Sequence, residues 1–162
     1  REAVLGGLSP SLNVPTVVLE DGRPLGESNA ILWYFAEGTR FLPTDSYERA
    51  QVLQWMFFEQ YKHEPGIAVV RFWVSISEDP PPPAEIEARR EAGRAALAAM
   101  ERHLAAHEFF VGGRFTIADI ALYAYTHVAP EGGFDLGAYP AVQEWLERVE
   151  AQPGVEPMNK KH

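Results

Sequence analysis

The residues that decide the fold run from Leu12 to Gly38 and read LNVPTVVLEDGRPLGESNAILWYFAEG. Residues 16–19 form an apolar, mostly β-branched run, a composition typical of a buried strand. The Asp21–Gly22 dipeptide is a strong short-range signal for a hairpin turn, and residues 23–26 are expected to form the return strand. This part of the stretch therefore predicts an antiparallel β-hairpin.

A helix is expected directly after the hairpin, because residues 30–36 are apolar and Gly38 follows them. A glycine at that position, C′, commonly ends a helix in a left-handed conformation. Ser28 is a suitable N-cap residue, because a serine hydroxyl can accept a hydrogen bond from an N–H group of the first turn. The N–H groups of a helix start attract anions. The stretch thus predicts a helix with an anion-binding start.

The same residues, in this order, resemble the second half of the thioredoxin-like, glutathione-binding domain of cytosolic glutathione transferases. The resemblance rests on Val14–Pro15, on the hairpin, and on Glu27–Ser28 with the Asn-Ala-Ile that follows. In that family the valine–proline bond is cis and the valine backbone pairs with the cysteinyl part of glutathione. The acid–serine pair holds the γ-glutamyl end, consistent with the preference of a carboxylate for the positive end of a helix.

The resemblance implies a set of glutathione-binding residues, which are Asn13, Val14, Pro15, Glu27 and Ser28. Asn13 is the weaker match, at a position where relatives often have a polar or basic side chain. Taken one at a time, Pro15 also fits a residue that only begins a strand, and Ser28 one that only caps a helix. The complete set favours glutathione as the bound co-substrate, and no metal is expected.

The resembled family has a strand-helix-strand unit before this stretch, and that unit carries the catalytic tyrosine, serine or cysteine. The sequence begins at Arg1 and the unit is not found in it. We therefore expect a thioredoxin-like domain that lacks its first strand-helix-strand, and the catalytic residue stays unknown.

Composition restricts the classes of partner. The 162 residues are 46% hydrophobic and 23% charged, as in ordinary globular proteins. The formal net charge of -9 argues against nucleic acid or an anionic membrane surface as the partner. The lack of cysteine excludes disulfides, thiolate metal sites and a cysteine nucleophile within these residues. Neither a signal peptide nor an apolar run of membrane-spanning length is found, so we expect a cytoplasmic protein.

Two domains are expected. Residues 1–38 form the partial thioredoxin-like α/β domain, and residues 39–162 form an all-α helical-bundle domain of the glutathione transferase type. Residues 39–45 contain a Phe-Leu-Pro turn and are expected to link the two. The predicted fold class is therefore mostly α.

The first helical pattern of the second domain begins at Ser46 and is unusually aromatic. Leu53, Phe57 and Tyr61 lie four residues apart on one face, and Pro65–Gly66 is expected to kink or split the helix. There are too many apolar residues for one buried face. The pattern fits a central core helix. It also fits a helix with one side in a dimer interface and another lining the pocket for the second substrate.

A proline run, Asp79–Pro83, separates this helix from the next one, expected over residues 84–107. Such a run fits a stiff connection between helices, or a motif for a proline-binding module, and Pro83 fits the first turn of a helix. One face of the second helix is formed by Ile86, Gly93, Leu97, Met100 and Leu104. His103 and His107 lie four apart, a spacing that suits a metal or a helix C-terminus, and no third ligand is near.

Residues 112–120 read GGRFTIADI, in which Thr116 and Asp119 fit a capping box. Glutathione transferases carry a similar Gly-Gly-x-x-Ser/Thr-x-Ala-Asp-Ile motif at the start of the core helix of their all-α domain, where its role is folding. A final amphipathic helix is predicted from the spacing of Val142, Trp145, Leu146 and Val149. The resemblance covers residues 12–154.

The resemblance implies a glutathione S-transferase that conjugates the glutathione thiolate to small electrophiles and serves in detoxification. It also implies that the protein is a homodimer. Tyr61, His63 and Phe72 are candidates for contacts with the electrophile. Two alternatives remain on the same fold: a non-catalytic binding or scaffold protein, and a glutathione-dependent reductase or isomerase.

Overall fold

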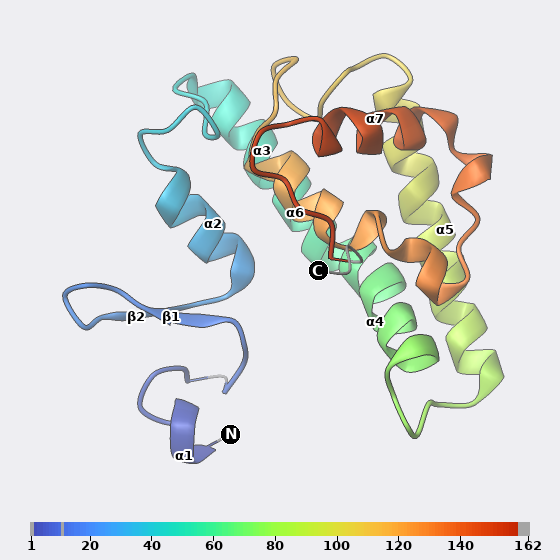
Figure 1. Cartoon of the computed structure of the whole chain (residues 1–162), viewed down its shortest axis with the longest axis horizontal. Helices are drawn as coiled ribbons and strands as arrows, with labels where there is room; N and C mark the ends of the chain where they lie inside the picture. Colours follow the sequence, from blue (N-terminus) through green and yellow to red (C-terminus); the bar gives the residue numbers. More distant parts are fainter. Residues whose placement is uncertain (1, 11, 159–162) are drawn as a thin grey trace. The chain divides into compact units, whose positions relative to one another are not determined.

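The structure is a computed structural model that describes residues 2–10 and 12–158 (Figure 1). The chain divides into two compact units, Arg1–Leu42 and Pro43–His162, and the predicted linker spans the boundary between them. Helices dominate, and the described strands form a two-stranded sheet. The predicted fold class, mostly α with a small α/β part first, is confirmed. No helix of the described ranges is long and apolar enough to cross a membrane.

The first unit contains the predicted hairpin, which follows the short helix α1 (Glu2–Leu5). Strands β1 (Thr16–Val18) and β2 (Pro24–Gly26) pair antiparallel, and Thr16 lies opposite Gly26 at the end away from the turn. Each strand is one residue shorter than predicted.

The turn of the hairpin is built on Asp21–Gly22, as predicted. Gly22 has a φ of 85°, a left-handed conformation that glycine adopts without steric cost. The N–H of Leu19 donates to the carbonyl of Arg23 at 2.9 Å, which closes the turn. The turn chemistry therefore sets the register of the strands.

Helix α2 (Ser28–Ala36) follows the hairpin and ends before Gly38, whose φ of 75° confirms the predicted C′ glycine. The prediction that Ser28 is the N-cap is wrong by one residue. Glu27 occupies the cap position with φ 65° and ψ 119°, and its side chain makes no capping hydrogen bond. The chain turns into the helix at Glu27, so Ser28 is already the first helical residue.

The second unit is a helical bundle. In chain order its elements are α3 (Ser46–Phe58), the π-helix η1 (Glu59–His63), α4 (Glu64–Ser75), α5 (Pro83–Leu104), α6 (Ile117–Thr126), the 3-10 helices η2 (Ala129–Gly132) and η3 (Leu136–Ala138), and α7 (Pro140–Glu150). The first three form one continuous helical run (Figure 1).

The interruption predicted at Pro65–Gly66 is confirmed as a π-helical turn directly before it. A proline has no N–H to donate, and its ring clashes with the carbonyl four residues earlier, which here belongs to Tyr61. The wider turn η1 accommodates this clash and divides the run into α3 and α4.

The face of the α3–η1–α4 run that is buried differs from the apolar face that the sequence spacing predicts. In α3 and η1 the buried side chains are Val52, Met56, Glu59 and His63. Leu53, Phe57 and Tyr61 are exposed, Tyr61 at 83%. The core interpretation is therefore wrong for these three residues, which form an apolar strip along the surface of the second unit.

Helices α4 and α5 cross at two glycines. A Cβ atom on Gly66 would lie 2.6 Å from the backbone nitrogen of Gly93, and a Cβ on Gly93 would lie 2.9 Å from the carbonyl oxygen of Gly66. Only glycine at both positions permits this separation of the two backbones.

Helix α5 begins with Pro83 in its first turn, as predicted, and its predicted core face is buried from Gly93 to Leu104. It ends at Leu104, three residues earlier than predicted. His103 lies in the last turn of α5 and His107 follows the helix, and both rings bond to backbone oxygens. His103 Nε2 lies 3.1 Å from the carbonyl oxygen of Phe110, and His107 Nδ1 lies 2.8 Å from the carbonyl oxygen of His103.

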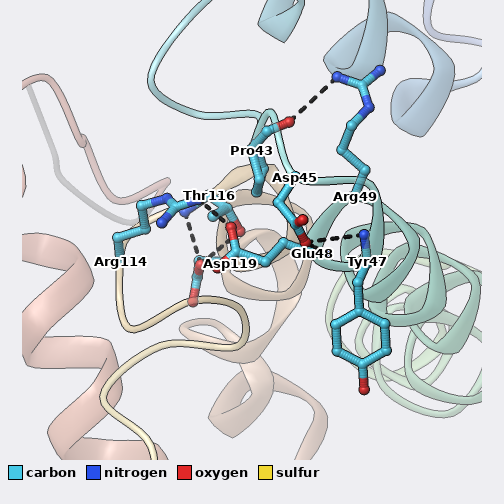
Figure 2. Close-up of polar contacts among 8 residues, drawn as sticks. All are labelled: Pro43, Asp45, Tyr47, Glu48, Arg49, Arg114, Thr116 and Asp119. Atoms are coloured by element: carbon cyan, nitrogen blue, oxygen red, sulfur yellow. Dashed lines mark hydrogen bonds and ion pairs between the residues drawn. The ribbon is translucent and has the colours of Figure 1, made fainter.

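The capping box of α6 is confirmed (Figure 2). The buried carboxylate of Asp119 accepts from the N–H of Thr116 at 2.9 Å, from the N–H of Phe110 at 3.1 Å and from the indole of Trp145 on α7 at 3.0 Å. Burial raises the pKa of Asp119, and these hydrogen bonds oppose the rise. Asp119 thus joins α6 to the preceding loop and to α7, which agrees with a folding role.

The starts of α3 and α6 are tied together at the surface (Figure 2). Asp45 caps α3 by accepting from the N–H groups of Tyr47 and Glu48, both at 3.0 Å. Glu48 forms an ion pair with Arg114 of the loop before α6.

Helix α7 buries all four residues predicted for its apolar face. Its first turn is capped from another helix, because Glu101 of α5 accepts from the N–H groups of Ala141 and Val142 at 3.1 and 3.0 Å. The end of the bundle is therefore fixed by a contact between residues 40 and 41 positions apart.

Candidate functional site

The five residues assigned to glutathione gather at one end of the hairpin. Since Thr16 pairs with Gly26, the segments that flank this pair, residues 13–15 and Glu27–Ser28, lie at the end of the sheet opposite the turn. All five side chains are exposed. The hairpin register thus places these residues beside one another on the surface of the first unit.

The Val14–Pro15 peptide bond is cis, as the resemblance implied. The hydroxyl of Thr16 donates to the carbonyl of Asn13 at 2.9 Å, and this bond fixes the backbone that precedes Val14. Within residues 2–10 and 12–158, no hydrogen bond is made by the N–H or carbonyl of Val14, which is 66% exposed. A peptide-like ligand can therefore pair with this backbone as an added strand does.

Glu27 places an anionic side chain beside the Ser28 hydroxyl and the positive N-terminal end of α2. The Ser28 hydroxyl and the first N–H groups of the helix suit a carboxylate, because the N-terminal end of a helix is positive. The Glu27 carboxylate suits an ammonium group. A ligand that carries both groups on one carbon, as the γ-glutamyl end of glutathione does, matches this pair.

A shallow cavity of about 390 Å³ lies elsewhere on the first unit, between the turn of the hairpin and α2. Its lining consists of residues 18–21, Tyr34 and Phe35. None of the five assigned residues lines it, so the cavity and the assigned site are separate.

A larger groove of about 550 Å³ lies on the second unit between the α3–η1–α4 run and α5. It is lined by Phe58, Tyr61, Lys62, Pro65, Gly66, Arg89, Ala92, Ala95 and Ala96. No sequence pattern predicted that Lys62, Arg89 and Ala92 share one surface. The sequence feature that could have indicated this groove is the run of small residues on α5 opposite Gly66. Small residues let the two helices approach closely and leave a shallow floor beside their crossing.

Of the three candidates for electrophile contacts, Tyr61 and Phe72 are exposed and His63 is fully buried. His63 Nε2 lies 2.8 Å from the hydroxyl of Thr126, which itself donates to the carbonyl of Leu122 at 2.6 Å. Burial lowers the pKa of His63 to about 3. The prediction that His63 contacts a substrate is therefore wrong, because the π-helical turn directs its ring into the core.

Known proteins share this architecture. Residues 67–153 match the family model of the glutathione S-transferase C-terminal domain. The disulfide-bond oxidoreductase YfcG of Escherichia coli is 31% identical over 90% of this chain and 71% of its own length. A glutathione S-transferase crystal structure from Pseudomonas fluorescens is 49% identical, with a TM-score of 0.91 over 99% of this chain and 80% of its own.

A third relative is solved with a ligand. The structure of a sphingomonad glutathione S-transferase complexed with glutathione is 27% identical and has a TM-score of 0.78, covering 93% of this chain and 73% of that one. The matched family model spans more than half of the present chain, and the Pseudomonas fluorescens structure covers nearly all of it. The chain belongs to the glutathione S-transferase family.

Proposed function

We propose that the protein binds glutathione through Asn13, Val14, Pro15, Glu27 and Ser28 and conjugates its thiolate to small electrophiles. The observation that carries the proposal is that the exposed Val14 backbone, which makes no hydrogen bond within the described part of the chain, meets the Glu27–Ser28 pair at one end of the hairpin. The glutathione complex of the sphingomonad relative supports the choice of ligand.

The proposed binding assigns one role to each group. Ser28 and the start of α2 hold the γ-glutamyl carboxylate, Glu27 holds the ammonium, and the backbone of Val14 pairs with the cysteinyl part. Conjugation also requires a hydrogen-bond donor that lowers the pKa of the glutathione thiol and stabilises the thiolate. We assign no catalytic residue to this role. A cytoplasmic detoxification reaction fits this chemistry.

A second candidate reaction is glutathione-dependent reduction of disulfides. The observation that favours it is the similarity to YfcG, which is named as a disulfide-bond oxidoreductase. The same glutathione site would serve both reactions. Assays with 1-chloro-2,4-dinitrobenzene and with bis(2-hydroxyethyl) disulfide separate them, since the first reports conjugation and the second reduction.

We also propose that the protein is a homodimer that uses the groove of the second unit and the apolar strip of Leu53, Phe57 and Tyr61. Exposed aromatic side chains are enriched in the cores of protein interfaces. A groove of about 550 Å³ with a small-residue floor offers a concave partner to such side chains.

The test of glutathione binding is calorimetric titration of glutathione into the protein and into Ser28→Ala, Glu27→Gln and the control Glu20→Gln. A charge-assisted hydrogen bond contributes about 1.5–3 kcal/mol, so each site variant should bind roughly tenfold to a hundredfold more weakly. Glu20 is exposed near the turn, away from the assigned site, and its variant should bind normally. Unchanged affinity in both folded site variants would contradict the assignment and favour the scaffold interpretation.

A further inference from the structure

The C-terminal segment of the second unit is held to α6 through one imidazole ring. After α7 the chain turns and runs back toward α6 (Figure 1). There the N–H of Met158 donates to Nε2 of His127 at 3.0 Å. The other ring nitrogen, Nδ1, lies 2.8 Å from the carbonyl oxygen of Tyr123, one turn earlier on α6. His127 therefore bridges the helix and the returning segment.

These two contacts specify one protonation state of the ring. A carbonyl oxygen only accepts, so Nδ1 of His127 must carry a proton. A backbone N–H only donates, so Nε2 must offer its lone pair to Met158. Neutral imidazole with its proton on Nδ1 satisfies both contacts. Imidazolium carries a proton on each nitrogen, and its Nε2–H would face the N–H of Met158.

The other described histidines lack this sensitivity. Each bonds through a ring nitrogen to an oxygen: His63 to the hydroxyl of Thr126, His103 to the carbonyl of Phe110, and His107 to the carbonyl of His103. Donation to a carbonyl survives protonation of the ring, because imidazolium donates from both nitrogens. Among the four histidines that the structure describes, His127 alone accepts a hydrogen bond from a backbone N–H.

The groups near His127 are a tyrosine ring and two glutamates. The ring of Tyr123 stacks on it with centroids 4.4 Å apart, and the Tyr123 hydroxyl donates to Glu150 of α7 at 3.2 Å. Burial raises the pKa of Tyr123, so its hydroxyl stays neutral in the range where histidines titrate. The returning segment carries the exposed Glu156. No ion pair joins His127 to either glutamate in the described residues.

We propose that His127 is a pH-sensitive latch for residues 155–158. The neutral ring holds the segment against the end of α6, and protonation of Nε2 releases it. Histidine side chains change charge between about pH 5 and pH 8, so mild acidification opens the latch. The latch lies within the second unit and does not depend on the proposed glutathione site.

The test is amide hydrogen exchange of Met158, followed by NMR in the full chain at about pH 7.5 and about pH 5. Loss of one hydrogen bond should lower the protection factor of this amide about fivefold at the acidic pH, after correction for the intrinsic exchange rate. In His127→Gln the side-chain oxygen can still accept but does not titrate, so protection should be equal at the two pH values. The control His107→Gln should behave as the wild type.

A second variant guards against misfolding of His127→Gln. Met158→Pro removes the donor and leaves the ring in place, so the protection of the Val155 amide should be low at both pH values. A wild-type protection factor for Met158 that is the same at both pH values would overturn the latch. An equal fall in folded His127→Gln would overturn it as well.

Discussion

At the scale of the residue, His63 is a buried ionisable group that forms no ion pair with the residues that the structure describes. Its Nε2 bonds to Thr126, and its Nδ1 has no hydrogen-bond partner among the described residues. Because the ring is fully buried, the charged form would lose its hydration without compensation, and the pKa falls to about 3. The native state therefore keeps this ring neutral at pH values where the unfolded chain protonates it.

This difference predicts acid destabilisation. The pKa is lower in the folded state than the ordinary 6.5, so the stabilisation is present above pH 6.5 and is lost as the pH falls toward 3. Between pH 7 and pH 5 one such group removes about 2 kcal/mol from the free energy of unfolding. Urea unfolding at both pH values measures it. His63→Gln should lose about 2 kcal/mol less than the wild type over this interval. The exposed-site variant His107→Gln is the control, and an equal loss in all three proteins would contradict the prediction.

At the scale of the element, the crossing of α4 and α5 depends on the absence of a side chain. Alanine is usually the better helix residue, by about 1 kcal/mol over glycine. At Gly66 the added Cβ would lie 2.6 and 2.7 Å from backbone atoms of Gly93, which cannot move without separating the helices. Steric overlap in a packed core typically costs about 1–3 kcal/mol and here outweighs the helix propensity.

The cost of overlap less the gain in helix propensity leaves a net destabilisation of up to about 2 kcal/mol for Gly66→Ala, measured by the midpoint of urea unfolding. The matched control is Gly7→Ala, because a Cβ on Gly7 meets no atom within 4 Å. A Gly66→Ala variant as stable as the wild type would mean that the helices separate at little cost.

At the scale of the whole molecule, the proposed homodimer predicts a mass of about twice 18.1 kDa by light scattering at micromolar concentration. Ala95→Arg places a charge on the floor of the groove and should shift the protein toward the monomer. Ala88→Arg makes the same change at an exposed position of α5 outside the groove and should leave the mass unchanged. A monomeric wild type, or equal effects of the two variants, would contradict the proposed interface.

The sequence by itself determined the parts of this protein that depend on neighbouring residues. The Asp21–Gly22 turn, the C′ glycine Gly38 and the capping box of Thr116 and Asp119 are confirmed because each is a contact within about four positions. The five glutathione residues were assigned from the resemblance to glutathione transferases, and the hairpin register then brings their segments to the same end of the sheet.

Only the tertiary structure decided the contacts between distant residues. Which face of the α3–η1–α4 run is buried depends on the helices that cover it. The apolar strip is therefore exposed to solvent, whereas His63 is buried in the core. The π-helical turn also rotates the side chains that follow it, which periodicity in a regular helix does not anticipate. The capping of α7 by Glu101 could not be predicted from the sequence either. Glu101 and the first turn of α7 lie about 40 positions apart, and only the packing of α5 against α7 brings them into contact.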